Sequence, residues 1–168
     1  MRVAVALLPV LALAACASAP QPPQVPANLQ PPAGQVLHLE TLASGVQIYE
    51  CQAKADGSGR AWVFKAPEAA LTDRAGKSLG KHYGGPTWEG LDGSTVVGEV
   101  KARDPGPDAK AIPWLLLAAK SNGGSGVFSA TKSIQRVATV GGPAPAEACT
   151  AAGQVARVPY TATYYFYR

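Results

Sequence analysis

Hydrophobic and polar residues alternate along several short segments of the chain, and alternation with a period of two is typical of strands that bury one face. The clearest case is residues 158–167, near the C-terminal end. One side of this segment carries Val158, Tyr160, Ala162, Tyr164 and Phe166. Aromatic and β-branched residues favour strands, so we expect a closing strand of a sheet here.

Other segments predict further strands and the turns between them. Residues 45–52 and 61–65 are rich in β-branched and aromatic residues and flank the turn sequence Asp56-Gly57-Ser58-Gly59, which predicts a β-hairpin. Residues 73–76 and 91–93 predict two more turns, and residues 132–140 predict another strand.

Residues 94–102 predict a half-exposed strand followed by a polar loop over residues 103–110. The alternation places Val96, Val100 and Ala102 on one face of this strand, and Thr95, Glu99 and Lys101 on the other.

Periodicity does not decide between helix and strand for residues 112–119, because the segment is almost wholly apolar. Pro113 at a first helical position, with Gly123 and Gly124 beyond, would suit a short helix. The neighbouring segments are strand-like on both sides, and we therefore favour a buried strand.

Composition supports a single β domain. The chain of 168 residues holds 18 glycines and 15 prolines, which favour many turns, and its 47% of hydrophobic residues is enough to form a core. We predict a mostly β, single-domain antiparallel β-sandwich or barrel over residues 35–168, with about seven or eight short strands and little helix.

The N-terminal residues predict an export signal. Arg2 precedes an apolar run, residues 3–14, that is too short to span a bilayer. The run ends in Leu13-Ala14-Ala15-Cys16, which resembles the bacterial lipobox, in which the cysteine is lipidated and becomes the mature N-terminus. We expect a signal peptide over residues 1–15 and lipidation of Cys16; the alternative is ordinary secretion after cleavage nearby.

Lipidation would anchor the protein to a membrane of the bacterial cell envelope. Ala17 and Ser18 differ from the Asp that favours inner-membrane retention in enteric bacteria, so we expect the outer membrane, facing the periplasm. Residues 16–34 then form a proline-rich tether. In extended polyproline II, at about 3.1 Å per residue, it would span up to about 55 Å, although a disordered spacer fits the composition equally well.

Two cysteines, Cys51 and Cys149, remain for an exported domain if Cys16 carries lipid. In an oxidising compartment they predict a disulfide, and two separately buried thiols are the alternative. We expect no metal site, because the chain has no C-x-x-C motif and neither His38 nor His82 has ligand spacing to a cysteine.

Charge does not indicate a nucleic-acid partner. The net charge is only +4, and the basic residues are scattered. The sequence also lacks a G-x-G-x-x-G motif between a strand and a helix, so it does not support a nicotinamide-binding fold.

The densest cluster of polar and aromatic residues lies in residues 82–92. It contains His82, Tyr83, Trp88, Glu89 and Asp92 around a Gly-Gly-Pro bend. As a ligand site, it would offer His82 as a general base, with Glu89 or Asp92 to orient it. The structural alternative, which we favour, places Trp88 in the core and lets His82 donate a hydrogen bond to a backbone carbonyl.

Arg136 is a further candidate, because it is polar between Ile134 and Ala138 on one expected strand face. It would either hold a carboxylate inside the sheet, which is the commoner arrangement, or receive an anionic ligand.

Several segments together resemble the domain-of-unknown-function family 3455 of secreted bacterial and fungal proteins, over residues 34–168. They are Ile48-Tyr49-Glu50-Cys51, His82-Tyr83-Gly84-Gly85-Pro86-Thr87-Trp88-Glu89, Asp92-Gly93-Ser94, Ile112-Pro113-Trp114-Leu115-Leu116-Leu117, Ile134-Gln135-Arg136, Gly141-Gly142-Pro143-Ala144-Pro145 and Tyr160-Thr161-Ala162. The resemblance implies no activity, no cofactor and no catalytic residues.

The sequence leaves three hypotheses for function. The first, which we favour, is a non-enzymatic module that binds a small ligand or another envelope protein. The second is a periplasmic, hydrolase-like enzyme that uses His82 with Glu89 or Asp92. The third is a structural envelope lipoprotein. A cavity lined by His82, Trp88 and Arg136 would favour the first two, and a flat apolar patch the third.

Overall fold

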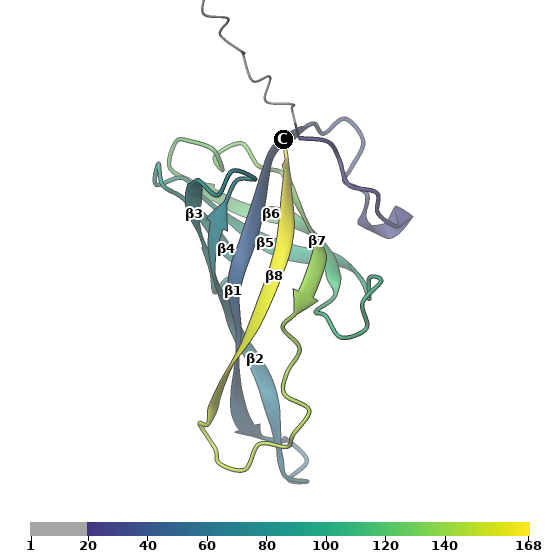
Figure 1. The fold of residues 1–168 in the computed structure, drawn as a ribbon, viewed down its shortest axis with the longest axis vertical. Helices are drawn as coiled ribbons and strands as arrows, with labels where there is room; N and C mark the ends of the chain where they lie inside the picture. The colour runs from purple at the N-terminus through teal and green to yellow at the C-terminus, as the bar shows by residue number, and fades with distance from the viewer. Residues whose placement is uncertain (1–19) are drawn as a thin grey trace, which may run out of the picture.

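The computed structural model describes residues 20–168, and within them eight strands form one antiparallel sheet that closes into a barrel. Each strand pairs with its sequence neighbours, and β8 pairs with β1 to complete the ring (Figure 1). The strands are β1 (Leu37–Ala53), β2 (Arg60–Thr72), β3 (Ser78–Tyr83), β4 (Thr87–Gly90), β5 (Thr95–Asp104), β6 (Trp114–Gly123), β7 (Ser133–Gly141) and β8 (Val155–Tyr167). The prediction of a mostly β, antiparallel single domain is confirmed.

The ambiguous apolar segment forms a strand. β6 begins at Trp114, and Ile112 and Pro113 end the loop before it. The predicted hairpin is also confirmed, because β1 and β2 pair across the turn that contains Asp56. The carboxylate of Asp56 accepts a hydrogen bond from the Ser58 amide (2.9 Å), and this arrangement stabilises the turn locally.

The core lies inside the barrel, where inward-facing side chains of all eight strands meet. As predicted, Tyr160, Ala162, Tyr164 and Phe166 of β8 belong to this buried core. They pack with Trp88 and with aliphatic residues of the facing strands. Burial of this apolar surface is the main favourable term that closes the sheet.

The predicted faces of β5 are wrong at one end. The β5–β6 register shifts between Val100 and Ala102, so Arg103 rather than Ala102 follows Val100 on the inward face. A β-bulge inserts one extra residue and reverses the alternation beyond it. No sequence pattern signals this bulge.

One end of the barrel is filled. We call it the closed end; it carries the β2–β3 and β4–β5 turns and the β6–β7 loop. Phe128 of that loop is completely buried, and its ring centroid lies 4.9 Å from that of Phe166. The other end, which we call the open end, carries the β3–β4 turn and the β5–β6 and β7–β8 loops.

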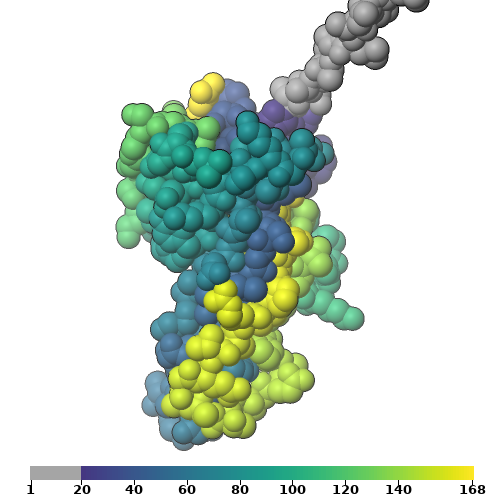
Figure 2. Space-filling model, turned by 60° about the vertical axis from the view of Figure 1, so that its left-hand side comes forward, coloured from purple at the N-terminus to yellow at the C-terminus, as the bar shows by residue number. Residues whose placement is uncertain are grey.

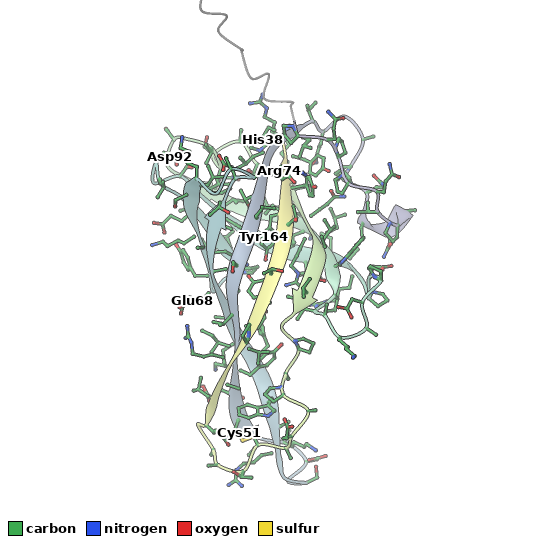
Figure 3. All side chains as sticks on the ribbon, in the orientation of Figure 1. His38, Cys51, Glu68, Arg74, Asp92 and Tyr164 are labelled. Carbon is green, nitrogen blue, oxygen red and sulfur yellow. A yellow bond between two sulfur atoms is a disulfide. The ribbon has the colours of Figure 1, made fainter. Side chains whose placement is uncertain are left out.

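Beyond the open end, β1, β2 and β8 continue as a narrower extension, seen below the broad body in Figure 2. Its far part is held by the predicted disulfide, which is confirmed: Cys51 of β1 is bonded to Cys149 of the β7–β8 loop, with their Cα atoms 5.7 Å apart. Trp62 also donates a hydrogen bond to the Glu147 carbonyl of the same loop (2.9 Å). Figure 3 shows Asp92 at the closed end, Tyr164 in the barrel and Cys51 far along the extension.

Part of the proline-rich segment packs against the outside of the barrel. Its 3-10 turn η1 (Ala27–Leu29) buries Leu29 completely, and the Leu29 carbonyl accepts a hydrogen bond from Gln135 of β7 (2.7 Å). The Tyr167 hydroxyl in turn donates to Gln135 (2.6 Å). Residues 27–29 of the expected tether are therefore packed on the barrel.

The expected signal peptide and Cys16 lie outside the described residues, 20–168. Among these residues, no helix has the length and apolar character needed to cross a membrane.

Candidate functional site

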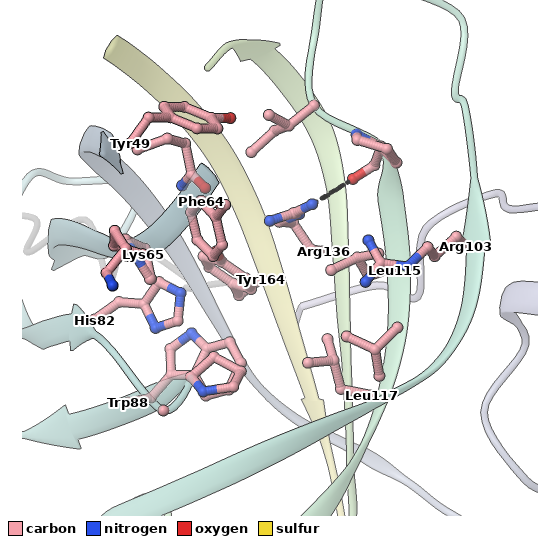
Figure 4. Close-up of a pocket in the computed structure, with 17 residues that line it drawn as sticks. Tyr49, Phe64, Lys65, His82, Trp88, Arg103, Leu115, Leu117, Arg136 and Tyr164 are labelled. Carbon is pink, nitrogen blue, oxygen red and sulfur yellow. Dashed lines mark hydrogen bonds between the residues drawn. The ribbon is translucent and has the colours of Figure 1, made fainter. Parts of the chain in front are cut away.

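A cavity of about 530 Å³ occupies the open end of the barrel. Figure 4 shows the side chains that converge on it. The described residues that line it are Gln47, Tyr49, Phe64, Lys65, Pro67, His82, Gly85, Pro86, Trp88, Val100, Arg103, Ile112, Pro113, Leu115, Leu117, Arg136 and Tyr164. Most of these are apolar, three are cationic and none is acidic.

Trp88 of β4 forms the floor of the cavity. Its side chain is 1% exposed, and its ring makes edge contacts with Tyr164 (5.2 Å between centroids) and Phe166 (6.0 Å). Gly98 of β5 makes room for the indole, since a Cβ atom there would lie 2.9 Å from the Trp88 ring. The indole therefore separates the packed closed end from the cavity.

His82 of β3 lies on the cavity wall beside Trp88. The two residues are paired across the β3 and β4 strands, and their rings stack with centroids 4.3 Å apart. Nδ1 of His82 lies 2.8 Å from the Thr87 carbonyl. A carbonyl only accepts hydrogen bonds, so Nδ1 carries the hydrogen and Nε2 keeps its lone pair.

The imidazole of His82 is neutral at physiological pH. Burial lowers the pKa of His82 to about 3; the hydrogen bond with Thr87 opposes this shift, and the charge of Arg136 adds to it. A general base works best with a pKa near the operating pH. His82 is thus suited to accept a hydrogen bond, and poorly suited to collect a proton.

Arg136 projects into the cavity from β7 (Figure 4). Its Nε and Nη2 atoms donate to the carbonyl of Pro113, at 3.2 and 2.8 Å. None of the ion pairs among residues 20–168 includes Arg136. The predicted arrangement in which a carboxylate inside the sheet holds this arginine is therefore not found.

Four buried polar atoms at the cavity or beside it lack a hydrogen-bond partner of ordinary geometry. They are Nε2 of Gln47, Nε1 of Trp88 and the hydroxyls of Tyr160 and Tyr164. Each of these side chains is at most 3% exposed. The Tyr160 hydroxyl still interacts with Gln47 and Tyr164, and the Tyr164 hydroxyl with Arg136, but at poorer geometry. Buried polar groups are usually paired, so this cluster needs an explanation.

The remaining predicted site residues lie elsewhere. Glu89 is paired with Lys81 on the outer face of the sheet, where its carboxylate also accepts a hydrogen bond from the Tyr83 hydroxyl (2.8 Å). His82 points inward from the strand position between Lys81 and Tyr83. Glu89 therefore does not orient His82, and this predicted pairing is wrong.

Asp92 has a structural role at the closed end. Its carboxylate accepts hydrogen bonds from the Ser94 hydroxyl (2.6 Å), the Ser94 amide (3.0 Å) and the Val127 amide (2.8 Å). These contacts hold the β6–β7 loop that inserts Phe128. Asp92 thus lies at the opposite end of the barrel from the cavity, and its predicted pairing with His82 is wrong as well.

No group of three His, Cys, Asp or Glu side chains within residues 20–168 is arranged to hold a metal ion.

Comparison with known families identifies the domain. Residues 32–168 match the family described as "Protein of unknown function (DUF3455)". The chain belongs to this family. No curated protein and no solved structure matches it.

Three of the site residues predicted from the sequence line the same cavity: His82, Trp88 and Arg136. The sequence analysis does not identify Gln47, Tyr160 and Tyr164 as polar residues of this region. The alternation of β8 already puts both tyrosines on the core face, and two hydroxyls on an apolar face are a signal that points to a polar interior. Gln47 is a similar polar residue on the inward face of β1.

Proposed function

We propose that this protein is an envelope lipoprotein whose barrel domain binds a small ligand in the open-end cavity, without converting it chemically. The observation that carries the proposal is the cluster of unpaired buried polar atoms around a cavity of about 530 Å³. Pockets for small ligands commonly measure about 300 to 1,000 Å³, with apolar walls and a few convergent polar groups.

The energetics support a ligand more than a purely structural interior. Each buried polar group that lacks a partner costs about 1–3 kcal/mol. Gln47, Tyr160, Tyr164 and Arg136 interact with one another, but Gln47, Tyr160 and Tyr164 lack hydrogen bonds of ordinary geometry, so we expect this cluster to weaken the folded state relative to fully paired groups. A domain selected only for stability would have phenylalanine or an aliphatic residue at these positions.

The cavity favours binding over catalysis. Its single histidine has a strongly lowered pKa, and no carboxylate lies among the described residues that line it. The pairing of His82 with Glu89 or Asp92, on which the hydrolase hypothesis depended, is not present.

A neutral apolar fluorophore, N-phenyl-1-naphthylamine, tests the proposal. The Cys16→Ser form of the full chain keeps every described residue without a lipid, and we expect it to bind the probe with enhanced fluorescence. Leu115→Trp should fill the cavity and abolish the signal, with Leu117→Phe as a second filling variant. Leu42→Trp, at a partly exposed position on the outer face of β1, is the matched control.

Failure of the wild-type domain to bind the probe would contradict the proposal. Equal binding by wild type and both filling variants would contradict it too, provided that their melting curves show folded proteins.

The anchoring part of the proposal needs a separate test. Cys16→Ser should abolish incorporation of a fatty-acid label and release the domain from membranes. Membrane association that persists in Cys16→Ser would show that the proposed lipid anchoring is wrong.

A further inference from the structure

The charged side chains that line the cavity are all positive. Arg136 lies in the wall, and Lys65 and Arg103 lie among the exposed residues at the open end. The β5 bulge turns Arg103 toward this side of the sheet, opposite Leu115. Glu50 lies 3.7 Å from Lys65 and offsets its charge, whereas Arg136 and Arg103 have no ion-pair partner within the described residues, so these two arginines make the cavity attractive to anions.

Arg136 has unused donors. A guanidinium carries five N–H groups, and the bonds to Pro113 use only two of its nitrogen atoms. Its charge also reaches the groups around it, because it contributes to lowering the pKa of His82 and opposes the raised pKa values of Tyr49, Tyr160 and Tyr164. Arg136 therefore faces a shared space rather than a single partner.

The groups nearest to this arginine are polar and buried. Tyr164 is opposite Arg136 in the β7–β8 register, and Tyr160 is on the same face of β8. Their hydroxyls and the amide nitrogen of Gln47 lie buried behind the cavity wall and interact with one another and with Arg136, so they place polar groups around the guanidinium rather than an apolar core.

The rest of the cavity is apolar. Leu115 and Leu117 of β6 and Val100 of β5 line one side, and the Trp88 indole forms the floor. A small inorganic anion would leave this surface in contact with water only. An apolar body attached to the anionic group would cover it, and the burial would add to affinity.

We propose that the ligand is an apolar organic anion, such as an aliphatic or aromatic carboxylate, whose anionic head lies against Arg136 and whose body lies on Leu115, Leu117 and Trp88. The inference rests on the proposed ligand-binding function and specifies the ligand class. Arg136 binds the head, and the neutral His82 imidazole adds no second positive charge beside it.

Displacement of N-phenyl-1-naphthylamine by three compounds with an unbranched ten-carbon chain, decanoate, decanol and decyltrimethylammonium, tests this inference at pH 7.5. We expect decanoate to displace the probe at a concentration about tenfold or more below that of decanol, since a charge-assisted hydrogen bond distinguishes them by about that factor. The cationic compound should be the weakest.

Arg136→Gln should weaken decanoate about tenfold or more and leave the neutral probe and decanol nearly unchanged. Arg136→Lys should restore part of the difference. Lys101→Gln, which removes one positive charge from the exposed outer face of β5, is the matched control and should have little effect.

The outcomes separate this inference from the proposed function. Equal displacement by decanoate and decanol, stronger displacement by the cation, or an unchanged decanoate affinity in Arg136→Gln would overturn the anion assignment, while probe binding in the cavity would still support a ligand site. A probe that does not bind wild type would overturn both.

Discussion

The two ends of the barrel differ in how their interiors are filled and in how their buried polar groups are hydrogen-bonded. At the closed end, Phe128 fills the barrel, and the polar groups around it are hydrogen-bonded: the Phe128 amide donates to the Ser94 hydroxyl (3.1 Å), and that hydroxyl donates to Asp92. At the open end, a cavity remains, and the polar groups of Gln47, Tyr160 and Tyr164 lack hydrogen bonds of ordinary geometry. The contrast supports our proposal that the open end binds a ligand, while the closed end is packed for stability.

The disulfide gives the largest expected effect, and it stabilises the extension beyond the open end. Cys51 and Cys149 are separated by 98 residues, and closing a loop of that length contributes roughly 4–5 kcal/mol in the chain-entropy account. The Cys51→Ser/Cys149→Ser double variant should lose stability of this order in urea unfolding. A change below about 1 kcal/mol would show that the extension is held by its other contacts.

Core truncation compares the two ends directly. Phe166→Ala, at the closed end, should cost about 3–5 kcal/mol, because it opens a void among Phe128 and Trp88. Leu115→Ala should lower the free energy of unfolding by less, about 2 kcal/mol, because it only enlarges an existing cavity. Urea unfolding measures both. Equal losses would indicate that the open end is packed as tightly as the closed end.

A pair of hydroxyl deletions gives the next effect. Ser94→Ala should cost about 1–3 kcal/mol, because it leaves the buried Phe128 amide without an acceptor. Tyr164→Phe should leave the free energy of unfolding nearly unchanged or raise it, because it removes a buried hydroxyl whose contacts with Tyr160 and Arg136 fall short of ordinary hydrogen-bond geometry. If Tyr164→Phe is the more destabilising of the two, the hydroxyl is part of a structural network.

The pH dependence of stability gives a smaller effect. The pKa of His82 is about 3 in the folded protein, whereas an unperturbed histidine has a pKa of about 6.5, so below pH 6.5 the unfolded chain binds a proton that the folded chain does not. Stability is therefore fully present above pH 6.5 and falls as the pH drops toward 3, by about 1.4 kcal/mol per pH unit.

Urea unfolding between pH 7.5 and 5.5 measures this slope above the range in which carboxylates titrate. His82→Gln should remove most of it. Burial and the charge of Arg168 also lower the pKa of His38, so His38→Gln shows the remaining contribution. An unchanged slope in His82→Gln would contradict the buried, neutral state of this ring.

Much of the fold could be predicted from the sequence, because strands that bury one face leave a period-two record. The alternation of β8 and the hairpin around Asp56 belong to this class. The inward direction of the Arg103 side chain could not be predicted, because it depends on a local register shift that no residue type indicates. The docking of Leu29 on Gln135 was equally hidden, because proline-rich composition does not distinguish a free segment from a packed one.

The candidate site was predictable only in part, for a geometric reason. His82 and Glu89 are neighbours in the sequence cluster, but they belong to adjacent strands and opposite faces. Proximity in sequence therefore grouped residues that the sheet separates. Arg136 and Tyr164 are far from His82 in the chain and are brought to the same cavity only by closure of the barrel.

The central claim, that the open end is kept for a ligand at the expense of stability, is tested most directly by the unfolding free energy of Arg136→Met without ligand. Arg136 has no carboxylate partner within the described chain, its hydrogen bonds of ordinary geometry go to one carbonyl, and its contact with the Tyr164 hydroxyl is looser, so an apolar residue of similar length should leave stability within about 1 kcal/mol of wild type or raise it. A loss of about 3 kcal/mol or more, which is typical of breaking a buried structural network, would contradict the account.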